Sequence, residues 1–239
     1  MPPAKAQALA LQVVAGHAVA GVMAPAAIDE VLTVLHQLSD ESAADFLRRL
    51  LVNLVADKRL PKYQFERRFD CLFSPFLPAI AAHVLGFEAS LVVPEFPLKK
   101  SNSNQSTNAD HLLMLRNAEG APLSWLLVEL KTDATSYSPL QADIYKDAIR
   151  DGWPRLRSDL EQIRQASKAK EAYTHLIARV DGVAGSSPPD DVEVLYITPS
   201  SKPPHGFHSV HFAELVKLTL GPNEQVWEVL KTLVLPELH

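Results

Sequence analysis

The sequence predicts an α/β fold with a central mixed β-sheet flanked by helices, preceded by a helical N-terminal extension. Three apolar segments, 91–98, 109–115 and 123–132, have the length and the boundaries of consecutive strands. A long amphipathic segment that begins at Pro139 follows them and indicates a helix. Further apolar runs come after this helix, and such alternation of helices with strands is typical of the α/β class.

Residues 1–60 are expected to form the helical extension, and they contain no recognisable catalytic pattern. Apolar residues recur at helical spacing over 28–38, and Ser39 or Asp40 can cap the helix that follows. The apolar stretch 8–27 has some features of a secretory signal, but polar residues interrupt it, so we expect no signal peptide. No segment is apolar enough over a sufficient length to indicate a membrane-spanning helix.

Residues 61–239 are expected to form the α/β domain itself. A helix over 63–83, broken near its prolines, precedes the first strand. A turn around Gly120 makes the strands at 109–115 and 123–132 an antiparallel hairpin. Antiparallel pairing brings the beginning of one strand beside the end of the next, so residues at those two ends should meet.

The second half of the domain follows from the same kinds of pattern. The long helix after the hairpin is expected to be interrupted near Gly152. Two further strands are predicted at 173–180 and 192–198, with a flexible stretch at 182–189 between them. A closing helix is predicted at 224–233.

The charge of the chain limits the kinds of partner it can have. It carries 23 basic and 28 acidic residues, a formal net charge of −5, which argues against tight nonspecific binding to nucleic acid. Metal sites collect carboxylates, however, so an acidic total does not exclude a nucleic-acid substrate. The single cysteine, Cys71, excludes an intramolecular disulfide and favours a reducing, cytoplasmic location; we expect it to be a small buried apolar residue.

Two charged residues stand inside the third predicted strand. Glu129 and Lys131 alternate with Leu130, so they share one face, and Trp125 and Leu127 lie on that same face. A charge placed among apolar side chains is costly unless it is paired or bound to a metal ion. The pattern therefore indicates compensation by another group, although a surface strand with a Glu–Lys pair also fits it.

Asp110, at the start of the preceding strand, is the expected partner. Hairpin pairing should bring it next to Glu129, and two adjacent carboxylates repel unless a cation lies between them. Oxygen ligands of this kind suit Mg²⁺ or Mn²⁺. The helix that follows adds Gln141 and Tyr145 on one face, one turn apart, although a tyrosine there can also simply pack on the sheet.

The ordered set of motifs resembles the PD-(D/E)XK nuclease superfamily, especially its RecB-like and exonuclease branches. The motifs are Asn108-Ala109-Asp110, then Glu129-Leu130-Lys131, then Gln141 and Tyr145, and the resemblance covers roughly residues 60–200. It implies a restriction-endonuclease-like core and Mg²⁺-dependent hydrolysis of DNA, with Mn²⁺ as a substitute. No proline precedes Asp110, and Thr107 stands where some members have glycine, so the branch is open.

The resemblance also implies individual roles. Asp110 and Glu129 would bind the metal ion together with the backbone carbonyl of Leu130. Lys131 would orient or activate the attacking water and offset charge at the phosphate. Gln141 and Tyr145 would support the site or contact the substrate strand.

The family often adds an acidic residue from the helix before the sheet. Glu66 is the candidate here, against the alternative of a solvated helix charge, and Glu95 is a weaker choice.

Other readings of the sequence remain open. The chain could be a nuclease-like fold that serves as a non-catalytic nucleic-acid-binding or assembly module, or a phosphodiesterase that acts on RNA. A homodimer would suit cleavage of both strands of a duplex. Histidines 205, 208 and 211 could bind zinc but lack an evident fourth ligand. The basic residues between 146 and 170 could line a phosphate-binding groove, but interleaved acids favour a solvated face.

Overall fold

The structure is a computed structural model that describes residues 40–57, 65–100, 106–133, 137–199 and 206–238. The chain divides into two compact units, Met1–Asn53 and Leu54–His239. The predicted helix at 28–38 and the apolar stretch at 8–27 lie outside the described residues. Helix α3 (Asp40–Asp57) is present where a helix starting at Ser39 or Asp40 was predicted. The β-sheet and the helices that pack on it belong to the second unit.

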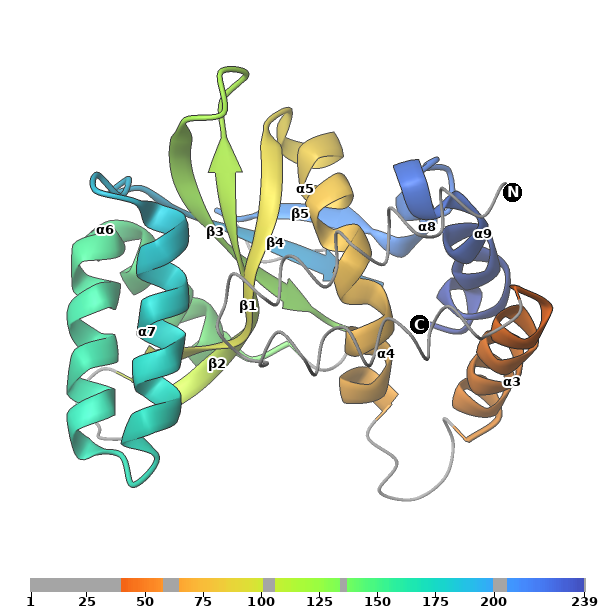
Figure 1. Cartoon of the computed structure of the whole chain (residues 1–239), viewed down its shortest axis with the longest axis horizontal. Helices are drawn as coiled ribbons and strands as arrows, with labels where there is room; N and C mark the ends of the chain where they lie inside the picture. Colours follow the sequence, from red (N-terminus) through yellow and green to blue (C-terminus); the bar gives the residue numbers. More distant parts are fainter. Residues whose placement is uncertain (1–39, 58–64, 101–105, 134–136, 200–205, 239) are drawn as a thin grey trace. The chain divides into compact units, whose positions relative to one another are not determined.

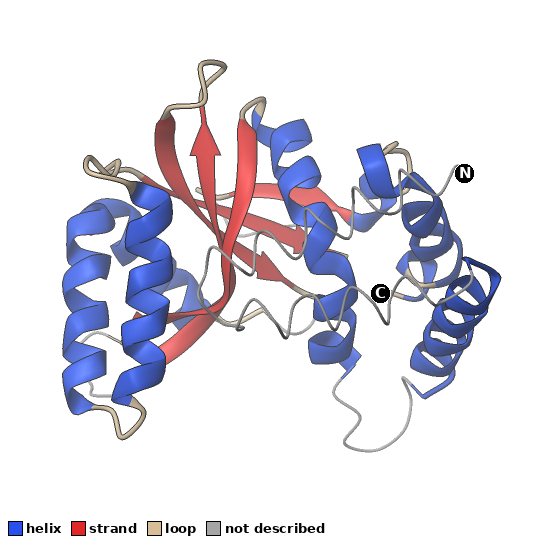
Figure 2. Cartoon of the chain, viewed as in Figure 1, coloured by secondary structure: helices blue, strands red, loops and turns tan. Residues whose placement is uncertain are grey.

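A five-stranded mixed sheet forms the centre of this unit (Figures 1 and 2). The strands lie in sequence order; β1, β2 and β3 pair antiparallel, whereas β3, β4 and β5 pair parallel. The antiparallel part confirms the predicted hairpin, and the whole confirms the α/β class with a mixed sheet. The strands are β1 (Glu88–Lys99), β2 (Ser106–Arg116), β3 (Pro122–Leu130), β4 (Val192–Thr198) and β5 (His208–His211).

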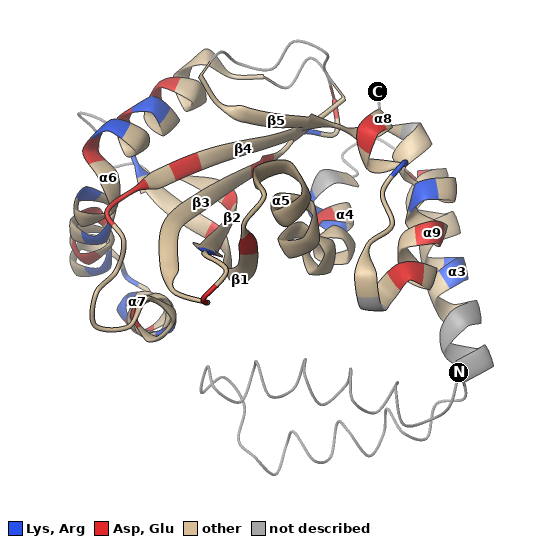
Figure 3. Ribbon diagram, turned by 90° about the horizontal axis from the view of Figure 1, so that it is seen from above, with Lys and Arg blue, Asp and Glu red and all other residues tan. Residues whose placement is uncertain are grey.

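Helices cover both faces of the sheet, as seen from above in Figure 3. Helices α6 and α7 pack on one face, where their apolar side chains join those of β1 to β4 in one buried cluster. Helices α4 and α5 lie on the other side, and Phe73 of α4 contacts Trp227 of α9 with ring centroids 6.1 Å apart. The helices of this unit are α4 (Phe65–Phe73), α5 (Leu77–Leu85), α6 (Pro139–Ala166), α7 (Lys170–Ala184), α8 (Phe212–Leu215) and α9 (Glu224–Leu233), with short 3₁₀ turns at Ser74–Phe76, Gly221–Asn223 and Leu235–Glu237.

Local sequence explains the two helix breaks. The turn at Ser74–Phe76 separates α4 from α5, because proline in its first turn cannot continue the hydrogen bonding of α4. Helix α6 is kinked at Gly152, whose φ of 69° favours glycine. A Cβ atom there would lie 2.8 Å from the carbonyl oxygen of Asp190, which accepts a hydrogen bond from Trp153. Both predicted interruptions are therefore confirmed.

One predicted strand is wrong. Residues 173–180 belong to α7, which continues to Ala184 and so also takes the start of the predicted flexible stretch 182–189. The buried side chains of this segment, Ile177, Val180 and Ala184, recur at helical spacing and pack against the sheet. A short run containing β-branched residues does not distinguish a strand from one face of a helix, and here the longer periodicity decides.

The remaining predicted elements agree with the structure within a few residues, and β4 and α9 have the predicted bounds. Cys71 is exposed, not buried as expected, because it lies on the face of α4 opposite Phe69 and Phe73. None of the helices within the described ranges combines the length and the apolar character needed to cross a bilayer.

Candidate active site

Pairing of β2 with β3 places Asp110 next to Glu129. His111 pairs with Val128, so the next residue on each strand is Asp110 and Glu129. The carboxylate of Asp110 turns toward β3, and its Oδ2 accepts a hydrogen bond of 2.6 Å from the backbone N–H of Leu130. The two carboxylates predicted to meet at the end of the hairpin therefore do so.

The carboxylate of Glu129 is the centre of a polar network. Its side chain is only 2% exposed. The hydroxyl of Tyr145 donates to Oε2, and Nε2 of Gln141 donates to Oε1 at 2.8 Å. The ammonium group of Lys131 pairs with the same Oε1 and also lies 3.4 Å from Oε1 of Gln141. These contacts bring together four of the residues that the sequence singled out.

Helix α6 positions its two members of this network through its N-terminus and its packing. The Ser138 hydroxyl accepts a hydrogen bond from the backbone N–H of Gln141, which fixes the first turn. One turn later Tyr145 is fully buried. Further along, Trp153 stacks on Trp125 of β3 with ring centroids 3.9 Å apart, which holds the helix against the strand that carries Glu129.

The electrostatics of the site reflect two carboxylates close together. Burial, followed by the charge of Glu129, raises the pKa of Asp110 to about 8. The hydrogen bond from Leu130 and the charge of Lys131 oppose this shift but do not cancel it. Burial and the neighbouring Glu129 also raise the pKa of Tyr145, so its phenol remains a hydrogen-bond donor. Without a cation, Asp110 therefore holds a proton at neutral pH.

The donor set suits a hard divalent cation. Each carboxylate has about four lone-pair positions, and the contacts above occupy three on Glu129 and one on Asp110. Across the described ranges, no group of three or more His, Cys, Asp or Glu side chains could hold a metal ion. An ion here would rely on two carboxylates, with a backbone carbonyl and water completing its shell. Mg²⁺ commonly binds in this way because it retains several waters.

Asp70 of α4 is an acidic residue near the site that the sequence did not single out. Its charge contributes to the raised pKa of Asp110, as the smallest of the causes. Its Oδ1 lies 3.5 Å from Nε2 of His111, a buried ring whose pKa burial lowers to about 4. The predicted candidate, Glu66, lies one turn earlier on α4, but its side chain is outside the described part of the structure. In the sequence, the four-residue spacing between Glu66 and Asp70 was the signal that could have indicated Asp70, because it places both acids on one face of a helix.

Glu95, the weaker candidate, is exposed and occupied elsewhere. Its Oε2 accepts a hydrogen bond of 2.8 Å from Nδ2 of Asn108. Its backbone has φ of 51°, unusual for a residue with a side chain, at a position where β1 departs from regular alternation. Glu95 lies opposite Asp110 in the pairing of β1 with β2, since Pro94 pairs with His111 and Phe96 with Ala109. Among the described residues, however, no hydrogen bond or ion pair joins Glu95 to Asp110 or Glu129.

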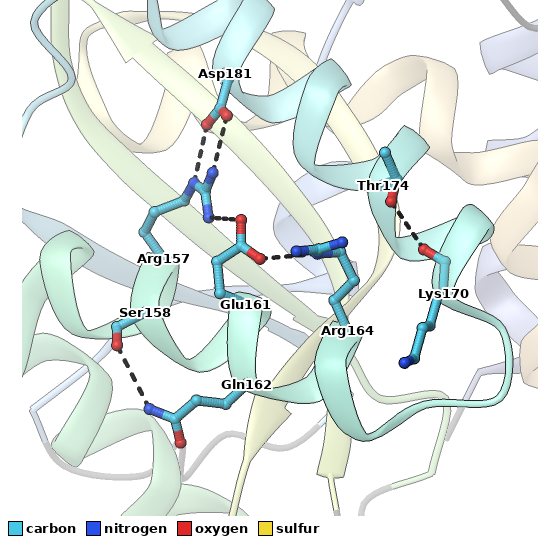
Figure 4. Close-up of polar contacts among 8 residues, drawn as sticks. All are labelled: Arg157, Ser158, Glu161, Gln162, Arg164, Lys170, Thr174 and Asp181. Atoms are coloured by element: carbon cyan, nitrogen blue, oxygen red, sulfur yellow. Dashed lines mark hydrogen bonds and ion pairs between the residues drawn. The ribbon is translucent and has the colours of Figure 1, made fainter.

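The two other predicted sites have ordinary structural roles where they are described. His208 pairs with Glu193 at 3.0 Å, and His211 caps α8, whereas His205 lies outside the described residues. Basic and acidic residues alternate along α6 (Figure 3). Arg157 binds Asp181 and Glu161, and Arg164 binds the same Glu161 (Figure 4), as expected for a solvated, ion-paired face.

Comparisons with protein-family models, with curated proteins and with solved structures found no match for this chain.

Proposed function

We propose that the protein is a metal-dependent nuclease of the PD-(D/E)XK type, with a restriction-endonuclease-like core, that hydrolyses DNA phosphodiester bonds. The observation that carries this proposal is the buried network around Glu129, which joins Lys131 and Gln141. Next to it, Asp110 has its pKa raised to about 8 by burial and by a second carboxylate. Two buried carboxyl groups beside a lysine are costly to ionise together without a cation, and they suit the binding of a cation next to a phosphate.

Asp110 and Glu129 would hold Mg²⁺ or Mn²⁺, with the backbone carbonyl of Leu130 as a further oxygen donor. Such an ion polarises a phosphoryl oxygen and lowers the pKa of a bound water. The protein supplies the orientation of these ligands. Gln141 and Tyr145 each donate a hydrogen bond to Glu129, and these two bonds fix the orientation of its carboxylate.

Lys131 supplies fixed positive charge where negative charge develops on the phosphoryl group. Its ammonium group is held at Glu129 and Gln141, and its side chain is 13% exposed, so it is screened little by solvent. Loss of one such electrostatic donor typically costs ~3 kcal/mol of transition-state stabilisation. Lys131 is therefore expected to contribute to the rate of cleavage more than to the stability of the fold.

The test is a cleavage assay on single-stranded, duplex, linear and circular DNA, and on RNA, with Mg²⁺, Mn²⁺ or a chelator. Cleavage that requires the divalent ion is expected for the wild-type protein and is abolished in Lys131→Ala, whose circular dichroism spectrum stays unchanged. Lys146→Ala is the matched control, because Lys146 is exposed on α6 and pairs with Asp143.

Full activity in Lys131→Ala would refute the assignment of the site. Binding of DNA without cleavage under any of these conditions would favour a non-catalytic module instead. Cleavage confined to RNA would leave the site in place and change the substrate.

A further inference from the structure

An aromatic wall lies beside the Glu129 carboxylate. It consists of Tyr137, Tyr196 and Phe207. Tyr196 stands on β4 directly opposite Glu129 in the pairing of β3 with β4. Its ring stacks on Phe207 with centroids 5.4 Å apart and meets the edge of Tyr145 at 5.9 Å. The aromatic wall therefore lies directly next to the polar network around Glu129.

The hydroxyl of Tyr196 is buried at this site, and the described part of the chain offers it no hydrogen-bond partner. The residue is 1% exposed, and among the described residues its oxygen has no hydrogen-bond partner. Burial, followed by the charge of Glu129, raises the pKa of this hydroxyl, which therefore remains a hydrogen-bond donor. The pairing of Tyr196 with Glu129 and its ring contact with Tyr137 place the residue beside these groups. Buried hydroxyls are nearly always hydrogen-bonded, so one that faces a cluster of functional groups is a candidate to bind a ligand.

Tyr137 extends the wall to the surface. Its ring meets Tyr196 edge-on at 6.5 Å, yet 43% of the residue is exposed. It directly precedes Ser138, the residue that caps α6 and fixes Gln141. The ring of Tyr137 is thus open to solvent at the rim of the site, whereas the ring of Tyr196 is buried beside Glu129.

The charged surface next to the site does not favour a duplex. Binding to a duplex depends on lysine and arginine at several phosphates. Along α6, however, Arg150, Arg155, Arg157 and Arg164 are each paired with a carboxylate, and the whole chain has a net charge of −5. Stacking on an aromatic ring requires an unpaired base, which a single strand offers and an intact duplex does not.

Building on the proposed function, we propose that the aromatic wall binds an unpaired nucleotide of a single-stranded DNA substrate. The exposed ring of Tyr137 stacks on the base. The hydroxyl of Tyr196 donates a hydrogen bond to an oxygen of the phosphate that lies next to Glu129. The preferred substrate is therefore a single strand or a frayed end and not an intact duplex.

Binding is measured first, separately from cleavage. Fluorescence anisotropy follows a labelled oligonucleotide, single-stranded or annealed to its complement, in Ca²⁺, and a gel verifies that the oligonucleotide stays intact. The wild-type protein is expected to bind the single strand more tightly. Tyr137→Leu, which keeps an apolar side chain but removes the stacking face, is expected to weaken that binding roughly tenfold.

Phe87→Leu is the matched control, since Phe87 is also an exposed aromatic residue, with 40% of its surface accessible. It lies away from the site, because it directly precedes Glu88, which pairs with Arg116 at the last residue of β2. The affinity of this variant is expected to match that of the wild-type protein. Equal affinity of the wild-type protein for the single-stranded and the annealed oligonucleotide, or an unchanged affinity in Tyr137→Leu, would overturn the role of Tyr137.

Tyr196→Phe tests the buried hydroxyl. If the hydroxyl contacts the substrate, the substitution lowers the rate of single-strand cleavage roughly tenfold at saturating substrate, and the melting temperature stays equal or rises because a buried unpaired polar group is removed. A fall in melting temperature with an unchanged rate would show that the hydroxyl is structural and would overturn its assignment.

The outcomes separate this inference from the proposed function. Suppose that the wild-type protein cleaves duplex and single strand equally well and that Tyr137→Leu has no effect. The proposed role of the aromatic wall in binding a single strand would then be overturned, while the nuclease assignment would stand. Wild-type protein that cleaves nothing but binds single strands through Tyr137 would overturn the nuclease assignment and support the wall.

Discussion

The charged residues of this domain occur in two settings that differ in how their charges are balanced. On the α6–α7 surface, Arg157 binds both oxygens of Asp181 at 3.0 Å and also reaches Glu161, so basic and acidic groups neutralise one another (Figure 4). Where the pairing of β2 with β3 stops, the carboxyl groups of Asp110 and Glu129 lie beside one lysine, Lys131, in a largely buried position.

The difference shows which charges require an explanation beyond the fold. Exposed ion pairs contribute about 0–1 kcal/mol each and can form on any helix with alternating charge. Burial, followed by the charge of Glu129, raises the pKa of Asp110 to about 8, so ionising both carboxyl groups in this position works against folding. A bound cation would remove that cost. The balance of charge, not the number of charged residues, therefore separates the candidate active site from the solvated surface.

The largest expected effect comes from the same substitution in the two settings. Asp110→Asn removes a proposed metal ligand and is expected to lower Mg²⁺-dependent cleavage by at least about 100-fold. Asp181→Asn removes a surface partner of Arg157 and is expected to leave cleavage within about twofold. Initial rates at saturating Mg²⁺ make the comparison, and equal rates in the two variants would contradict it.

The next effect is a proton released when the metal binds. Because the pKa of Asp110 is about 8 without metal, the ion competes with a proton below that pH. Metal affinity is expected to rise about tenfold per pH unit up to pH 8 and then level off. Calorimetric titration with Mn²⁺ between pH 6 and pH 9, in buffers of different ionisation enthalpy, measures both the affinity and the proton. Affinity independent of pH would contradict the buried-pair account.

A smaller effect concerns the stability of the metal-free protein. A carboxyl group whose pKa rises from 3.8 to about 8 on folding stabilises the fold below pH 3.8, and that contribution is lost as the pH rises through 8. Asp110→Asn, which keeps an acceptor for the Leu130 N–H, is therefore expected to be more stable than the wild-type protein at pH 9 in a chelator. Urea unfolding at pH 5 and pH 9 tests this. A wild-type protein that is the more stable one at pH 9 would refute the sign.

The smallest effect belongs to the surface. Arg157→Ala is expected to cost about 0–1 kcal/mol of unfolding free energy, and the difference should shrink in about 1 M salt because exposed pairs are screened. Thermal unfolding at low and high salt measures it. A larger, salt-independent loss would mean that the α6–α7 pairs are as tightly coupled to the fold as the buried network.

The sequence predicted the parts of the site that depend on local pattern. Strand alternation and the hairpin turn were enough to place Glu129 and Asp110 together, and helical spacing linked Gln141 with Tyr145. Contacts between distant segments could not be predicted in this way. Tyr196 comes opposite Glu129 only through the parallel pairing of β3 with β4, which a local pattern does not specify.

The same limit explains the errors on the helices. Residues 173–180 have a composition that fits a strand, and the helical spacing of the buried residues becomes clear only over the longer segment that ends at Ala184. In the sequence, nothing distinguishes Asp70 from other charged residues on a short helix. Its position near the site follows only from the packing of α4 beside β2. Cys71, its neighbour, is exposed for the related reason that the next residue on a helix points in another direction.

We propose that the buried carboxyl groups of Asp110 and Glu129 bind a divalent cation where the pairing of β2 with β3 stops. Titration of the metal-free protein with Mn²⁺, followed by calorimetry and by the rise in melting temperature, tests it most directly. Saturable binding at millimolar Mn²⁺ or below is expected for the wild-type protein and is lost in Asp110→Asn. Absence of binding at millimolar Mn²⁺, or equal binding in Asp110→Asn, would contradict the claim.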